Sequence, residues 1–180
     1  MILKTILTAG AAIALTTSVY AADYKLDPSH TSANFTVGHM GFSKTTGRFD
    51  EIEGSFTDTA GSESVNVTIK ASSIDSNFEP RDKHLRSPDF FDVKQYPTIT
   101  FKSTSVTKDK LVGELTMHGK TKPVTLDLEM VGEGDDPWGG YRKGYSATGT
   151  IKRSEWGINY GIPGISDEIE LVLHVEGIRQ

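Results

Sequence analysis

An alternation of apolar and polar side chains with a period of two recurs along the chain and constrains its fold more than any other feature. In residues 32–39, for example, Ala33, Phe35 and Val37 alternate with polar neighbours. Because successive side chains of a β-strand point to opposite faces, this pattern predicts a strand with one apolar face. Eight such segments are present, the second less regular than the others: residues 32–39, 47–57, 65–70, 98–102, 111–118, 124–130, 145–152 and 168–176.

The connections between most of these segments are short, as at residues 108–110 and 118–120. Short links imply antiparallel neighbours, since a parallel crossover needs about a dozen residues or more. Eight one-sided antiparallel strands can close into a barrel, which buries the apolar faces and removes the sheet edges. The interior of such a barrel is either filled by side chains or holds one small ligand. A two-sheet sandwich satisfies the alternation equally well, so the pattern leaves both architectures open.

One long irregular stretch, residues 75–97, interrupts the series of strands. Its segment 79–86 can form a single helical turn, because Pro80 suits the first position of a helix. The predicted fold class is therefore all-β, an eight-stranded antiparallel barrel with one long irregular insertion that contains a short helical turn.

The first residues have the pattern of a secretory signal peptide. Lys4 supplies a positive charge, residues 6–19 are small, apolar or hydroxyl-bearing, and residues 19–21 suit the positions before a cleavage site. The apolar run is shorter than the ~20 residues that a membrane-spanning helix needs. We therefore expect a cleaved signal peptide at residues 1–21, a single domain at residues 22–180, and a periplasmic location.

Composition and motif content exclude several classes of function. The chain has no cysteine, which excludes thiol chemistry and cysteine-bound metals. Its formal net charge is −5 with dispersed lysines, which argues against nucleic-acid binding and against a polybasic membrane patch. No segment after the first residues is apolar enough to span a membrane, so we expect no stable membrane insertion. The sequence has no nucleophile elbow and no glycine-rich nucleotide motif, and its five histidines lack a metal-binding spacing. We predict a protein that is not an enzyme and has no catalytic residues, no metal and no cofactor.

Basic and aromatic side chains lie close together in the insertion, where Arg81, His84 and Arg86 precede Phe90 and Phe91. A long loop in a small domain is often a lid or a binding loop. Cationic groups beside aromatic rings suit an amphipathic ligand with an anionic or polar head. Alternatively, the two phenylalanines plug one end of the barrel and the basic side chains are solvated. The sequence leaves both interpretations open.

Several short motifs spread over residues 22–180 carry a family resemblance, the longest of them at residues 81–93. The motifs are residues 27–30, 35–37, 81–93, 96–97, 100–101, 115–119, 122–124, 135–140 and 151–153. Together they resemble the YceI-like family. The resemblance implies a lipocalin-like barrel with a long apolar tunnel that binds a polyisoprenoid lipid, such as a polyprenyl phosphate or a quinone. It further implies export and, in some members, a homodimer.

We accordingly expect a periplasmic protein that sequesters or carries such a lipid; the alternative is a stress-related scavenger of other hydrophobic small molecules. The apolar strand rows provide the expected tunnel lining: Phe35, Val37, Val67, Ile69, Phe101, Leu115, Met117, Leu126, Leu128, Tyr145, Ala147, Leu171 and Leu173. The insertion provides the expected contacts to the head group at the tunnel mouth: Arg81, His84, Arg86, Phe90 and Phe91. The small residues Ala147 and Gly149 are expected to leave room inside the barrel.

Overall fold

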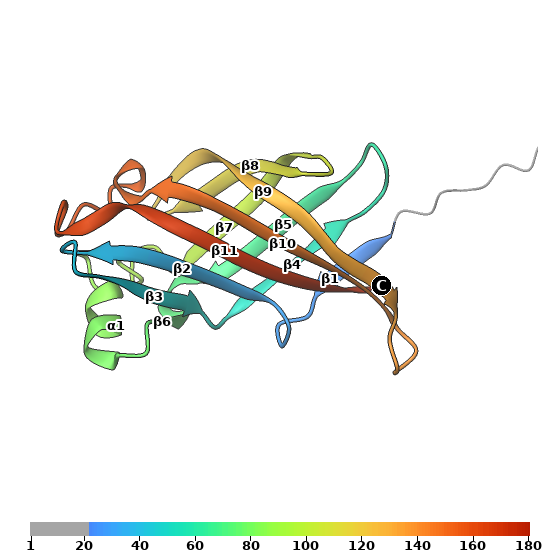
Figure 1. Cartoon of the computed structure of the whole chain (residues 1–180), viewed down its shortest axis with the longest axis horizontal. Helices are drawn as coiled ribbons and strands as arrows, with labels where there is room; N and C mark the ends of the chain where they lie inside the picture. Colours follow the sequence, from blue (N-terminus) through green and yellow to red (C-terminus); the bar gives the residue numbers. More distant parts are fainter. Residues whose placement is uncertain (1–21) are drawn as a thin grey trace, which may run out of the picture.

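The computed structural model describes residues 22–180, so the predicted signal peptide lies outside the described residues. These residues form an elongated β-barrel with one short α-helix at one end (Figure 1). No helix among them is long and apolar enough to cross a membrane. The elements are β1 (Asp23–Leu26), β2 (Ser32–His39), β3 (Ser43–Phe49), β4 (Ile52–Thr57), β5 (Ser64–Lys70), η1 (Ala71–Ser73), β6 (Ile74–Asp75), α1 (Glu79–Leu85), β7 (Thr98–Val106), β8 (Lys110–Met117), β9 (Lys120–Asp135), β10 (Tyr141–Lys152), η2 (Arg153–Trp156) and β11 (Ile165–Arg179).

Eight strands close into a ring in the order β1-β4-β5-β7-β8-β9-β10-β11, because β1 pairs with both β4 and β11. Every pairing in the ring is antiparallel. Toward the helix end, β2 and β3 continue the sheet from β11, and the short β6 pairs with β3. The predicted antiparallel barrel is therefore confirmed, and the two-sheet sandwich is not formed.

The predicted segment 32–39 coincides with β2, but the alternation misses the short strand β1 before it and the break inside segment 47–57. Both β1 and β2 pair with β11, one after the other, so they act as one strand interrupted between Leu26 and Ser32. In the same way, β3 and β4 are separated only by Asp50 and Glu51, which divide the predicted segment 47–57. β1 and β6 have four and two residues, too few for an alternation to be recognised from the sequence.

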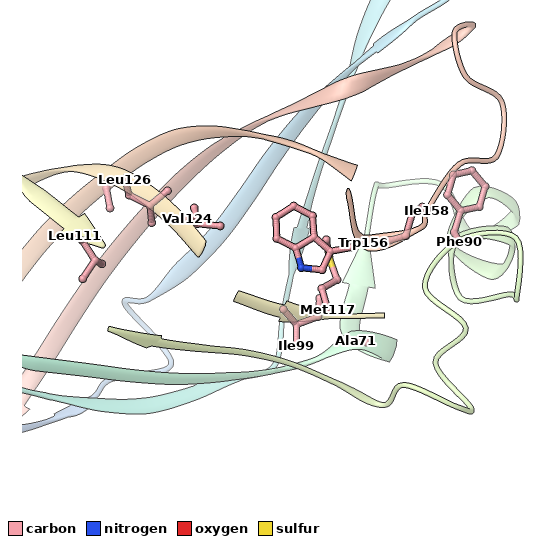
Figure 2. Packing of buried hydrophobic residues seen from close by; sticks show 10 residues of the cluster. Ala71, Phe90, Ile99, Leu111, Met117, Val124, Leu126, Trp156 and Ile158 are labelled. Atoms are coloured by element: carbon pink, nitrogen blue, oxygen red, sulfur yellow. The ribbon is translucent and has the colours of Figure 1, made fainter. Parts of the chain in front are cut away.

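A layer of buried apolar side chains closes the barrel at the helix end (Figure 2). Trp156 is 1% exposed, and its indole Nε1 donates a hydrogen bond to the carbonyl oxygen of Leu115 at 3.1 Å. Met117, Ile158 and Phe90 are buried in the same cluster. We call this the closed end of the barrel.

The insertion packs against the closed end, and its predicted helical turn is confirmed as α1, with Pro80 in the first turn. The buried carboxylate of Asp82 holds the helix start, since it accepts hydrogen bonds from the backbone N–H of Ser76 at 2.9 Å and from the Ser76 hydroxyl. Phe90 is buried, and Phe91 is half-buried with its ring edge-on to Phe49 at 5.6 Å between centroids. Phe90 is thus buried as the plug interpretation requires, and Phe91 is buried only in part.

Candidate binding cavity

The interior of the barrel encloses a cavity of about 530 Å³. Inward-facing side chains from β1 to β5 and from β7 to β11 form its wall, and most of them are Leu, Ile, Val or Phe. The volume lies within the range of roughly 300–1,000 Å³ that is typical of small-molecule sites. The cavity can therefore take an apolar ligand of moderate size.

All but one of the predicted lining residues lie on this wall: Phe35, Val67, Ile69, Phe101, Leu115, Met117, Leu126, Leu128, Tyr145, Ala147, Leu171 and Leu173. The exception is Val37, whose predicted position is wrong. Val37 lies between Phe35 and the tip of the β2–β3 hairpin, where the strands run past the end of the cavity. Ile99, Leu111 and Val124 also line the wall and belong to rows that the alternation identifies. Leu26 lines the wall too, but it belongs to no predicted row because β1 is too short to be recognised from the sequence.

The cavity stays open partly because aromatic rings lie over glycines in the wall. A methyl group added at Gly47 would stand 2.4 Å from Cζ of Phe35, and one added at Gly113 would stand 2.4 Å from Cζ of Phe101. With no side chain beneath them, these rings can lie close to the backbone. Gly149 has the same arrangement, since a methyl group there would stand 2.6 Å from Cδ2 of Leu126, another side chain of the cavity wall.

The cavity opens at the end opposite to α1. The residues of this opening, which we call the mouth, are Thr57, Asp58, Glu63, Thr107, Lys108 and Met130. They lie in or beside the β4–β5 and β7–β8 hairpins and on β9, all of which end away from the helix (Figure 1). Among the residues that line the cavity, Thr107, Lys108 and Met130 are the exposed ones, and Met130 is 50% exposed. The solvent therefore reaches the cavity at the mouth.

A buried lysine lies beneath the mouth. The ammonium group of Lys143, whose side chain is 8% exposed, donates hydrogen bonds to Asp58 and, at 3.1 Å, to Oε2 of Glu133. Burial lowers the pKa of Lys143, but these two hydrogen bonds outweigh it and leave the pKa raised, so the side chain stays charged. The same ammonium lies 5.7 Å from the ring centroid of Tyr145 on the cavity wall. Burial, reinforced by the negative charge of Asp58, raises the pKa of Tyr145 above its usual value.

The structure does not bring the basic residues of the insertion to the cavity. Arg81 donates to the hydroxyl and the carbonyl oxygen of Ser76 at 2.7 and 2.5 Å. Arg86 donates to the carbonyl oxygens of Ser72 and Ile74, both at 3.0 Å. These bonds satisfy loop carbonyls at the closed end, which corrects the expectation that the arginines lie at a tunnel mouth.

His84, Phe90 and Phe91 also lie off the cavity wall. Nε2 of His84 is 2.8 Å from Oδ2 of Asp89, and its ring packs edge-on against Phe90 at 5.1 Å between centroids. Of the two interpretations of the insertion, the geometry supports the plug.

A second polar cluster lies outside the cavity and joins two of the sequence motifs, residues 27–30 and 135–140. Nη1 of Arg142 is 2.6 Å from Oδ2 of Asp27 and 2.5 Å from Oε1 of Glu176, and its Nε is 2.8 Å from Oδ2 of Asp136. Hydrogen bonds from Ser29, Arg142 and His30 hold the pKa of Asp27 well below its usual range. The cluster ties the β1–β2 connection to β11 and to the β9–β10 hairpin.

Asp27, His30 and Glu176 are also the kind of group that could hold a metal ion, since one ligand atom from each lies within 4.8 Å of the others. The guanidinium of Arg142, however, already binds the two carboxylates with its positive charge. The arrangement is therefore an ion-pair network, which the sequence spacing does not reveal because its members come from distant strands.

Comparison with known proteins assigns this barrel. The model of the family described as "YceI-like domain" matches residues 24–177. Protein YceI of Escherichia coli O17:K52:H18 is 45% identical over 172 residues, which cover 91% of this chain and 90% of that protein. The UPF0312 protein of Pseudomonas aeruginosa (strain LESB58) is 44% identical, with 100% of both chains covered.

Solved structures share the fold. BcnA of Burkholderia cenocepacia superposes with a TM-score of 0.74 at 23% identity, covering 84% of this chain and 98% of that one. A polyisoprenoid binding domain from Saccharophagus degradans superposes with a TM-score of 0.67 at 17% identity, covering 87% and 98%. On the strength of the family match and the full-length relatives, this chain belongs to the YceI-like family.

Proposed function

We propose that the protein sequesters or carries a polyisoprenoid-type lipid inside its barrel, as a periplasmic binding protein rather than an enzyme. The observation that carries the proposal is the cavity of about 530 Å³, whose wall is mostly apolar and whose mouth is exposed. The polyisoprenoid binding domain from Saccharophagus degradans, which has the same fold, supports it.

The physical argument is that both the isoprenoid tail and the cavity wall are apolar. An isoprenoid tail carries no polar atoms, and its transfer from water to the cavity is favourable by ~25 cal/mol for each Å² of apolar surface removed from water. The deep wall offers Leu, Val, Ile and Phe side chains, with no charged group among them. The charged groups of the wall, Asp58, Glu63 and Lys108, all lie at the mouth. This distribution suits the binding of an amphipathic lipid.

The direct test is to identify what the protein carries. Protein purified from the periplasm of its own host is analysed by native mass spectrometry and by organic extraction, and we expect a mass that corresponds to an isoprenoid. A different apolar molecule would support the scavenger alternative, and turnover of the bound lipid would contradict the assignment as a binding protein.

A matched pair of variants locates the ligand. Ala147 is buried and lines the cavity, whereas the next residue of β10, Thr148, is exposed. Ala147→Phe inserts a ring into the cavity and should abolish carriage of the lipid, whereas Thr148→Phe should leave it unchanged. Equal carriage by both variants would show that the lipid binds elsewhere. Association into a homodimer stays a prediction from the family resemblance.

A further inference from the structure

We propose that two neighbouring loop tips at the closed end of the barrel dock reversibly on the surface of a lipid bilayer. The first tip, residues 39–43, forms the turn of the β2–β3 hairpin, and the second, residues 159–163, lies in the connection between η2 and β11. We call them together the docking tips. The inference goes beyond the proposed function, because it concerns the outer surface of the barrel and not its cavity.

The docking tips lie side by side at the far end of β2 and β11 (Figure 1). The backbone N–H of Met40 in the first tip donates a hydrogen bond to the carbonyl oxygen of Gly164, just after the second tip, at 2.6 Å. Tyr160 of the second tip packs against the insertion, with 5.2 Å between the centroids of its ring and that of Phe90. The two tips therefore form one surface that is fixed to the barrel.

Large apolar side chains project from both tips into the solvent. The exposed fractions are 87% for Phe42, 61% for Met40, 47% for Tyr160 and 39% for Ile162. Residues 38–43 and 156–166 contain no Asp, Glu, Lys or Arg, although these types make up 24% of the chain. Apolar side chains that gather at the surface in this way mark a site of interaction with a protein or a membrane.

The size and shape of this surface favour a bilayer over a protein. Its four large side chains expose roughly 500 Å² together, whereas a stable protein–protein interface buries about 800 Å² on each partner. A second copy of the chain would meet these protruding tips with its own, which leaves still less area in contact. A bilayer needs no matching shape, and its attraction increases with the apolar area that enters it. So small an area gives a reversible contact, from which washing releases the protein.

The backbone of the docking tips also suits an apolar surrounding. A peptide N–H group that enters the bilayer needs a partner within the protein, because hydrocarbon offers none. The N–H of Phe42 donates to the carbonyl oxygen of His39 at 3.0 Å, and that of Ile162 donates to the carbonyl oxygen of Asn159 at 3.4 Å. The apolar side chains can therefore enter the bilayer surface without leaving these donors unpaired. Tyrosine, such as Tyr160, is enriched where membranes meet water.

The opposite end of the barrel also exposes apolar side chains, but its charges oppose docking. Val131 and Trp138 of the β9–β10 hairpin are 71% and 78% exposed, and Glu133, Asp135 and Asp136 lie between them in sequence. Carboxylates are costly to desolvate, and the negative potential of an anionic membrane surface repels them. The closed end is therefore the end that docks, and the docked barrel directs its mouth away from the bilayer.

Binding of the mature protein to vesicles tests the proposal. Flotation is measured with vesicles of phosphatidylcholine and with vesicles of phosphatidylcholine and phosphatidylglycerol. We expect binding to both kinds and little loss when salt is added, because the docking tips carry no charges for salt to screen. Binding that requires phosphatidylglycerol, or that high salt abolishes, would overturn the inference, since the contact would then be electrostatic.

Two variants locate the contact. Phe42→Ser removes the most exposed ring, and Met40→Asn introduces a residue that tolerates the left-handed backbone of this position (φ 51°). Each should lower the partition coefficient onto vesicles by about tenfold, the effect of losing one large apolar side chain from the contact. Trp138→Ser, at a hairpin tip of the opposite end, is the matched control and should bind like the natural protein. Ala147→Phe should bind vesicles too, which separates docking from the uptake of lipid into the cavity.

Tryptophan fluorescence gives the orientation. The two natural tryptophans are Trp138, exposed at the opposite end, and Trp156, which is buried. Phe42→Trp adds a third at the docking tips. Vesicles whose lipids carry bromine on the acyl chains should quench the added tryptophan and leave the emission of the natural protein unchanged. Equal quenching of the natural protein would overturn the inference, because Trp138 would then lie at the bilayer.

The remaining outcomes are distinguishable. If the natural protein binds neither kind of vesicle, or if Phe42→Ser binds as well as the natural protein, the inference is overturned and the proposed function stands. Sedimentation equilibrium without vesicles detects a competing partner. Self-association that Phe42→Ser abolishes, in a protein that binds no vesicles, would assign the docking tips to a second copy of the chain and overturn the inference. Vesicle binding by a protein that carries no isoprenoid would support the inference and count only against the proposed function.

Discussion

Phe35 of β2 lies over Gly47 of the neighbouring β3, so closely that a methyl group on Gly47 would stand 2.4 Å from Cζ of the ring. The two residues are direct partners in the strand register. Because Phe35 is on the cavity wall, this contact determines how far its ring reaches into the cavity.

Gly47→Ala should therefore reduce both lipid binding and stability. Position 47 has no left-handed backbone that would exclude alanine, so the effect comes from the ring, which must move toward the cavity. Overpacking of this kind costs about 1–3 kcal/mol. The control is Gly132→Ala on β9, where an added methyl group meets no atom within 4 Å. Urea unfolding and lipid titration of both variants check the prediction. Equal stability and equal lipid affinity of the two variants would contradict it.

Asp27 should make stability depend on pH in the acid range. The pKa of its carboxyl is depressed in the folded state, so its contribution is complete above the unfolded value of about 3.9 and is lost as the pH falls toward the folded value. Asp27→Asn should cost about 2 kcal/mol at neutral pH, the size expected of hydrogen bonds to a charged group. The difference between the variant and the natural protein should narrow below pH ~4.

Thermal unfolding at a series of pH values measures this difference. The exposed carboxylate of Asp23 provides the control, as Asp23→Asn. A difference that stays constant down to pH ~2 would show that Asp27 acts through packing and not through its charge.

Arg81 and Arg86 should prove structural. Arg81→Ala and Arg86→Ala each leave buried or half-buried loop groups without their donors, which costs about 1–3 kcal/mol. Affinity for the lipid per folded molecule should not change, because neither side chain reaches the cavity. Lys83→Ala, an exposed position of the same helix, is the control. A loss of lipid affinity with an unchanged melting temperature would contradict this prediction and would indicate that the arginines contact the head group of the lipid.

The exported protein should begin at Ala22. Lys4, the apolar run and the small residue at position 21 predict cleavage there. N-terminal sequencing of protein released from the periplasm checks this. A chain that still carries Met1 after fractionation, or one that sediments with the inner membrane, would contradict both the cleavage and the proposed location.

The barrel could be predicted from the sequence because the alternation that indicates each strand lies within a few consecutive residues. Each strand of the ring except β1 carries its own alternation, and the inward row of that alternation is also the row that lines most of the cavity. Val37 marks the limit of this reasoning, since the alternation gives the face of a residue but not the point along the barrel where the cavity ends.

The polar parts of the site could not be predicted in the same way. Lys143 and Asp58 lie on β10 and beside β4, and their contact depends on how distant strands close into a ring. Arg81 and Arg86 show the opposite failure. Their clustering with aromatic residues is typical of a binding loop, yet the loop uses both guanidinium groups to satisfy its own carbonyls.

The pairing of β1 with β11 also determines when the barrel can close during folding. The strand that closes the ring joins residues 24–26 to residues 177–179, so the first strand has no partner on that side until the last strand has been synthesised. No partial chain can complete the barrel. Contacts so distant in sequence form slowly, because the intervening chain must first be ordered. The sheet therefore keeps two unpaired edges for as long as its final strand is missing.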